Sequence, residues 1–215
     1  MILRALVVTL VGAGATLWFA LAALDHARGP GAPFAVCLIG LVVGAVAGPF
    51  LFDEKGARPA AIRATFLGVA AAVACGLVAA LRDGPILASI ACGLFCGLWA
   101  FALAAVADLL GGDLWRPLVA LLGLALVATL FYWDDAFLLR ASSRASSAAL
   151  AFAINPAAAV SATLDFDWVH AKALYTDNQT AESMVNVARS GIGTYSLGLI
   201  AVAIPAAGLG AWRRR

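Results

Sequence analysis

The residues best able to do chemistry lie in one short polar stretch, DFDWVH, which covers residues 165–170. Asp165, Asp167 and His170 supply two carboxylates and an imidazole, a ligand set that can coordinate a divalent cation on one face of a helix. Aspartates near the start of a helix also cap it and meet the positive end of its dipole favourably. Capping is the simpler interpretation, and we expect no metal ion there.

The four cysteines, Cys37, Cys75, Cys92 and Cys96, all lie inside apolar stretches. Cys92 and Cys96 are one helical turn apart and share a helix face, so metal or redox use is an alternative for this pair. No histidine or carboxylate accompanies them, and buried thiols mostly pack as small apolar groups. We therefore interpret the cysteines as packing residues and not as a disulfide framework.

Several classes of function are disfavoured by residues that the sequence lacks. The two histidines, His26 and His170, lie in separate loops, so there is no His pair for a metalloprotease or for haem. No glycine-rich phosphate loop occurs, and the charged residues gather at the ends of the apolar stretches, with Asp108 near such an end. The net charge of +2 forms no basic patch for nucleic acid. We expect a protein without enzymatic activity, cofactor, metal or nucleic-acid partner.

The composition is that of a protein embedded in a lipid bilayer. Of the 215 residues, 64% are hydrophobic and 12% are charged, and the mean hydropathy is +0.98. Several uncharged windows reach about 18 residues, the length that a helix needs to cross the hydrocarbon core. The sequence predicts an all-α integral membrane protein with one polytopic domain over residues 1–215.

We expect six membrane spans, connected by short loops except before the last. The predicted spans cover residues 2–24, 33–52, 62–81, 85–109, 116–133 and 191–211. The first apolar run is longer than that of a secretory signal and lacks a clear cleavage site, which favours a retained span. Short loops force antiparallel neighbours, so the first five spans should form an up-and-down bundle.

The distribution of lysine and arginine predicts the orientation of the bundle. With the N-terminus in the cytoplasm, eight of the 14 basic residues fall on the inner side, including the terminal triplet 213–215. Positive charge flanking a span is typical of the cytoplasmic side. We expect an inner or plasma membrane protein with both termini in the cytoplasm.

Residues 134–190 form the one long connection and are predicted to lie outside. Within it, residues 145–164 are apolar but are interrupted by Asn155 and Pro156. We favour a broken helix that enters the outer leaflet and returns, since irregular backbone is tolerated at that depth where protein buries it. A pair of surface helices and a seventh span are the alternatives.

The residues that follow have the periodicity of an amphipathic helix lying on the membrane surface. Its apolar side would carry Phe166, Val169, Ala173 and Leu174, and its polar side Asp167, Lys172 and Asp177. Such a helix can gate an external opening, or it can serve as a docking surface for another subunit.

Small residues and one tryptophan predict how the spans pack. Gly40, Gly44 and Gly48 recur at a spacing of four, a pattern that lets helices approach closely. Trp99 lies in the middle of a span, where we interpret it as a packing residue.

The C-terminal half resembles the membrane subunits of ABC-2-type transporters. Those permeases often carry a hydrophobic-Asn-Pro-small step between their fifth and sixth spans, and here it reads Ile154-Asn155-Pro156-Ala157. The stretch LVALLGLALVATLFYWDDAF is similar to the penultimate span that leads into that step. The resemblance covers roughly residues 115–215.

The resemblance implies export or extraction of a hydrophobic or amphipathic substrate, with ATP hydrolysed by a separate ATP-binding-cassette subunit. It also implies a homodimer or a pairing with a second permease in the bilayer. The substrate or gate candidates are Asn155, Pro156, Asp165, Asp167, Trp168 and His170. The candidates for contact with the ATPase are Asp53, Glu54, Lys55 and Arg58, although a positively charged inner loop is the preferred explanation for them.

Two other functions stay open. A non-catalytic accessory or anchoring subunit would use its glycine-rich faces and its outer segment to pack against a larger complex. A lipid-modifying enzyme is the third alternative, but no pair of catalytic groups is evident at the membrane interface.

Overall fold

The computed structural model describes residues 31–52, 57–111, 113–133, 154–166 and 191–213, together with residues 7, 10–16 and 18. Within these ranges the chain is helical and contains no strand. The elements are α2 (Gly31–Ala47), the 3-10 turn η1 (Gly48–Phe50), α3 (Ala57–Leu81), α4 (Ile86–Leu110), α5 (Trp115–Trp133), α7 (Pro156–Thr163) and α9 (Ile192–Arg213).

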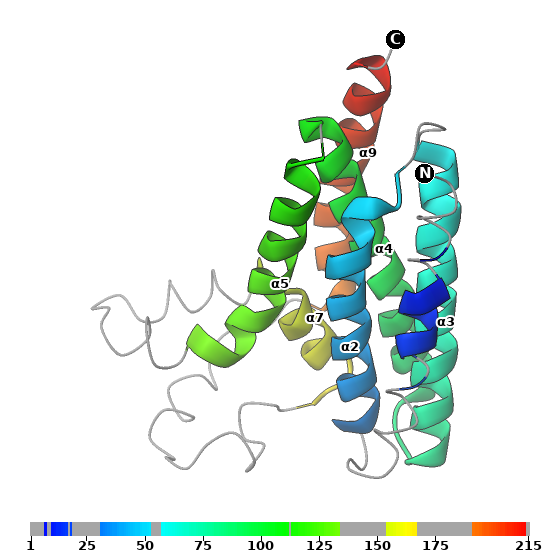
Figure 1. The fold of residues 1–215 in the computed structure, drawn as a ribbon. Coiled ribbons are helices and arrows are strands. Elements are labelled where there is room, and N and C mark those ends of the chain that lie inside the picture. Colours follow the sequence, from blue (N-terminus) through cyan, green and yellow to red (C-terminus); the bar gives the residue numbers. More distant parts are fainter. Residues whose placement is uncertain are drawn as a thin grey trace, which may run out of the picture.

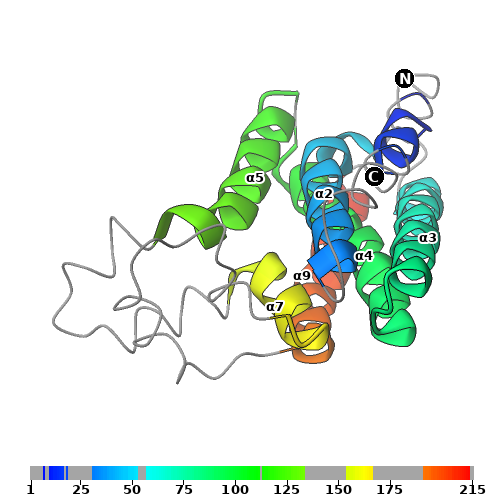
Figure 2. The same ribbon diagram turned by 90° about the horizontal axis from the view of Figure 1, so that it is seen from below.

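The long helices alternate in direction around α4. In Figure 1, α2, α4 and α9 rise while α3 and α5 descend, as short connections between neighbouring helices require. The helix α4 packs against α2, α3, α5 and α9, and its most extensive contact is with α3. The short helix α7 lies at the end of the bundle where α2, α4 and α9 begin, beside α2 and α9 when seen from below (Figure 2).

Within the described residues, four helices are long and apolar enough to cross a membrane, and they indicate a multi-pass membrane protein. They are Gly31–Phe50, Arg58–Leu81, Ile86–Leu110 and Ile192–Arg213. The helix α5 corresponds to the predicted fifth span, and its Trp115–Ala128 part is a shorter apolar stretch. Most of the predicted first span falls outside the described residues, so the count of six spans stays a prediction.

Two helices have ends that differ from the sequence prediction because of where proline lies. The helix α3 begins at Ala57, five residues before the predicted span, and Pro59 occupies its first turn, where a missing N–H group breaks no hydrogen bond. The helix α2 ends at Ala47, and Pro49 then lies in η1, which carries the chain on to Phe50.

The predicted glycine face of α2 brings this helix close to α4. A Cβ on Gly44 would lie 3.3 Å from the carbonyl oxygen of Cys96, and one on Gly48 would lie 2.6 Å from that of Ala100. Trp99 is 2% exposed, and its Nε1 donates to the carbonyl of Leu41 at 3.2 Å. Both predictions, close approach at the glycines and a packing role for Trp99, are confirmed.

Candidate functional site

The helical backbone is interrupted at Asn155, which lies between the helical residue Ile154 and the start of α7. Ile154 is helical, Asn155 is extended (φ −93°, ψ 118°), and Pro156 is the first residue of α7, where its fixed φ suits a helix start. The Asn155 side chain caps this helix: its Oδ1 accepts hydrogen bonds from the N–H groups of Ala157 at 2.8 Å and Ala158 at 3.2 Å. The predicted break at Asn155-Pro156 is therefore confirmed, while its insertion into a leaflet stays a prediction.

The same Asn155 side chain joins α7 to α5. Its Nδ2 donates to the carbonyl oxygen of Leu126 at 2.8 Å, and Asn155 as a whole is 2% exposed. A backbone carbonyl has two lone pairs, so Leu126 can accept this bond in addition to one within its own helix. A buried amide is expensive to leave without hydrogen-bond partners, which makes this a strongly preferred position for the start of α7.

Both ends of α7 are joined to the first turn of α9. At its C-terminal end, the Thr163 hydroxyl accepts from the N–H group of Ile192 at 2.9 Å and donates to the carbonyl of Ala159 at 2.9 Å. Ile192 opens α9, where the first N–H groups have no partner within the helix. At the other end, the Tyr195 hydroxyl donates to the carbonyl of Ile154 at 2.6 Å.

Apolar contacts complete the surroundings of residues 154–166, which we call the α7 segment. Its residues from Pro156 to Ser161 are buried, and α7 contacts α2, α4, α5 and α9. The Phe166 ring lies 4.9 Å from that of Phe34 in α2, and the Tyr195 ring meets Phe95 of α4 edge-on at 5.6 Å. The α7 segment thus packs against the four long helices α2, α4, α5 and α9, but not extensively against α3.

Two of the four buried polar residues in the described part of the bundle belong to the α7 segment. The buried polar residues of the described ranges are Thr16, Ser89, Asn155 and Ser161. Thr16 and Ser89 donate to carbonyls four residues earlier in the chain, which is a local arrangement. Asn155 differs from them because its bond to Leu126 crosses between helices. Among these four residues, Asn155 is therefore the one whose bonding would change if one helix moved against another.

The other predicted site residues are not brought together with Asn155. Asp165 is exposed just beyond α7, in a left-handed backbone conformation with φ 51°. Its partners in the predicted cluster, Asp167, Trp168 and His170, lie outside the described residues, as does the predicted surface helix. Among the residues described, no group of three or more His, Cys, Asp or Glu is arranged to hold a metal ion.

The first turn of α3, which carries one of the predicted ATPase-contact residues, lies at the opposite end of the bundle from α7 (Figure 1). Arg58 is exposed in the first turn of α3, whereas Asp53, Glu54 and Lys55 fall outside the described residues. Nearby, Arg63 Nη1 donates to the carbonyl of Leu51 at 2.7 Å and so joins α3 to the end of α2 and η1.

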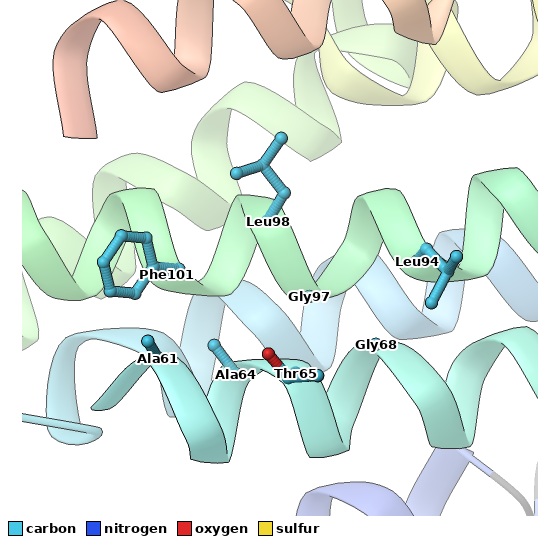
Figure 3. A pocket seen from close by; sticks show the side chains of 8 residues that line it. All are labelled: Ala61, Ala64, Thr65, Gly68, Leu94, Gly97, Leu98 and Phe101. Carbon is cyan, nitrogen blue, oxygen red and sulfur yellow. The ribbon is translucent and has the colours of Figure 1, made fainter. Parts of the chain in front are cut away.

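An apolar groove lies between the N-terminal half of α3 and the middle of α4 (Figure 3). Its volume is about 290 Å³, and it is partly open to the outside of the bundle. Gly68 and Gly97 face each other where the helices approach, and Leu94, Leu98 and Phe101 supply the larger side chains. The groove can accept a chain of methylene groups, but it offers almost no hydrogen-bonding partner.

Thr163 and Tyr195 were not identified from the sequence as parts of this site. Each has a hydroxyl group within an apolar segment, which is a weak signal that a buried partner exists. The partner itself is not evident, since Tyr195 and Ile154 are 41 residues apart.

Comparison with protein-family models, with curated proteins and with solved structures found no match to this chain.

Proposed function

We propose that the chain is the membrane-spanning permease subunit of an ATP-driven exporter of the ABC-2 type. The single observation that carries the proposal is the buried, hydrogen-bonded position of the α7 segment. It begins at the Asn-Pro step that such permeases often carry, it is buried at one end of the bundle, and hydrogen bonds join it to α5 and α9. We infer that α7 closes that end of the bundle and moves when the helices around it move.

Hydrogen-bond geometry supports a gate that has two discrete positions. The bonds from Asn155 to Leu126 and from Thr163 to Ile192 join side chains to backbone across helix boundaries, so they break if α5 or α9 shifts by even one bond length. Packed interfaces of this kind switch between arrangements rather than deforming continuously. ATP hydrolysis by the separate subunit would supply the free energy for that switch.

The substrate that we propose is hydrophobic or amphipathic. The groove between α3 and α4 is lined by apolar and small side chains and is accessible from the side of the bundle. A substrate that partitions into the bilayer reaches such a groove without crossing water. The described helices bury few polar groups, which also favours an apolar cargo over an ion.

We further propose that the protein lies in the inner or plasma membrane with both termini in the cytoplasm. In this orientation the α7 segment is on the outer side, and the ends of α4 and α9 are on the inner side, where Arg213 Nη1 donates to the carbonyl of Leu109 at 3.1 Å. The segment from Asp53 to Arg58, which runs into the first turn of α3, would then face the ATPase. A homodimer, or a pair with a second permease, would complete the transport path.

Purification of the full-length chain from its native membranes tests the proposal. An ATP-binding-cassette ATPase should co-purify in a fixed ratio, and the complex should hydrolyse ATP. Pro156→Ala, which lets the helix run straight through the break, should reduce ATP hydrolysis more than it reduces the amount of protein in the membrane. Pro205→Ala in the exposed middle of α9 is the matched control, since it also removes a proline from a helix.

Two outcomes would refute the permease proposal. The first is the absence of any such ATPase from a complex that is otherwise intact. The second is an equal loss of activity and of protein for Pro156→Ala, because it would make the α7 segment a purely structural element.

A non-catalytic accessory subunit is the second candidate, and the exposure of α9 favours it. The buried residues of α9 are Ala203, Ala206 and Gly210, while most of its apolar side chains face outward. A helix with so little burial within its own chain can pack against a larger membrane partner. This candidate predicts a stable complex of fixed composition that contains no ATPase.

A further inference from the structure

Three helices bring the four cysteines into one cluster in the apolar core. Cys37 comes from α2, Cys75 from α3, and Cys92 and Cys96 from α4, and all four are buried, free thiols. The Sγ atoms of Cys37 and Cys75 are 3.1 Å apart, although 38 positions separate these residues in the sequence. The thiols of Cys92 and Cys96 also lie next to that of Cys37.

The surroundings of the cluster favour a neutral product over a metal-thiolate site. Metal ligation requires thiolates, and four thiolates around a divalent cation would leave a net negative charge, which is very costly in an apolar core. The Cys96 thiol instead donates weakly to the carbonyls of Cys92 at 3.3 Å and Cys37 at 3.5 Å. No cluster of possible ligands within the described ranges has the arrangement of a metal site. A disulfide carries no charge and suits an apolar core.

We propose that Cys37 and Cys75 are an oxidisable pair that forms a disulfide between α2 and α3. The oxidant is an uncharged, membrane-permeable two-electron acceptor of the diazene class. One thiol adds across its N=N bond, and the second sulfur then attacks the first and displaces the nitrogen. The S–S bond forms, two protons and two electrons pass to the diazene, and the product is the corresponding hydrazine.

The geometry requires little movement for this reaction. A disulfide bond is about 2.05 Å long, so the two sulfur atoms must approach each other by only about 1 Å. Cys75 lies six residues before the end of α3, which places it roughly 9 Å inside the helix end at 1.5 Å per residue. A small neutral oxidant dissolved in the bilayer can reach that depth, whereas a charged disulfide such as oxidised glutathione cannot.

The test treats native membranes that contain the full-length chain with diamide, then denatures the protein and labels free thiols with a maleimide. The reduced chain should carry four adducts per molecule, and the diamide-treated chain two. Peptide mapping should find the α2 peptide joined to the α3 peptide. Treatment with oxidised glutathione should leave four adducts.

Serine variants identify the pair. Cys37→Ser and Cys75→Ser should each abolish the cross-linked peptide, and Cys92→Ser should keep it. The wild-type peptide map decides the matter even where a variant fails to fold. Four adducts after diamide, a cross-link between any other two cysteines, or equal oxidation by glutathione disulfide would each overturn the proposal.

Discussion

Replacement of Asn155 tests directly how α7 is held. Asn155→Ala removes the N-terminal cap, which contributes about 1 kcal/mol and in favourable cases about 2 kcal/mol. It also removes the buried bond to Leu126, a contribution of about 1 kcal/mol. We expect the free energy of unfolding to fall by about 2–3 kcal/mol, because both losses occur in an apolar environment that offers no water as a replacement.

Asn155→Ser separates the two contributions. A serine hydroxyl is a comparable N-cap acceptor, but it is too short to reach α5, so this variant should lose about 1 kcal/mol. Ser161→Ala is the matched control within α7, since the Ser161 hydroxyl donates to Ala158 in its own helix and alanine is the better helix former. It should change the free energy of unfolding by less than about 0.5 kcal/mol.

Equilibrium unfolding in mixed detergent, followed by tryptophan fluorescence, measures the three variants side by side. The expected order of stability is wild type and Ser161→Ala, then Asn155→Ser, then Asn155→Ala. If Asn155→Ala unfolds within about 0.5 kcal/mol of the wild type, the bonds made by Asn155 do not hold α7 and the reasoning is wrong.

Four further substitutions make three separate predictions, all checked by the same unfolding measurement. Tyr195→Phe keeps the ring but removes the bond to Ile154, so a loss of about 1 kcal/mol is expected, and no loss would show that this bond is unimportant. Gly97→Ala places a Cβ 2.6 Å from a backbone oxygen of α3 and should cost more than about 2 kcal/mol, whereas Gly198→Ala meets nothing within 4 Å and should be neutral or stabilising. Similar effects of the two glycine variants would contradict the close approach of α3 and α4. Trp99→Phe loses the bond to a carbonyl of α2 and part of a buried ring, and a loss below about 1 kcal/mol would contradict its packing role.

The positions of the long helices could be predicted well from the sequence. The spans predicted from hydropathy begin and end within one residue of α4 and α5. The agreement is close because a helix that crosses a bilayer must be apolar over the whole thickness of the hydrocarbon core. The prediction for α3 began too late, at residue 62, because Arg58 and Pro59 were assigned to a loop. A helix can extend beyond the hydrocarbon and carry such charges in its first turns.

The contacts that build the candidate site could be predicted only in part. The Asn155-Pro156 step is a strong local signal, since both residues favour the start of a helix. Its partners on α5 and α9 depend on how helices distant in the sequence pack together, which periodicity does not specify. The same holds for Cys37 and Cys75: the sequence shows apolar surroundings for each thiol but not that they are neighbours.

The cysteine pair and the α7 segment lie in one continuous apolar cluster. Cys37, Cys75 and Val160 all belong to it, together with Trp99 of α4. A disulfide between α2 and α3 would restrict two of the helices that surround this cluster. Oxidation should therefore stiffen the part of the bundle against which α7 packs.

A cross-link that locks α7 to α9 tests the central claim most directly. A Cβ at Gly191 would lie 3.2 Å from Thr163 Oγ1, so a Thr163→Cys/Gly191→Cys pair is placed to form a disulfide. A Cys37→Ser background removes the native oxidisable pair. The measurement is ATP hydrolysis by the complex purified from native membranes, before oxidation, after oxidation and after reduction. If α7 is the moving gate of an exporter, hydrolysis falls several-fold on cross-linking and recovers on reduction; unchanged hydrolysis with a verified cross-link would contradict the claim.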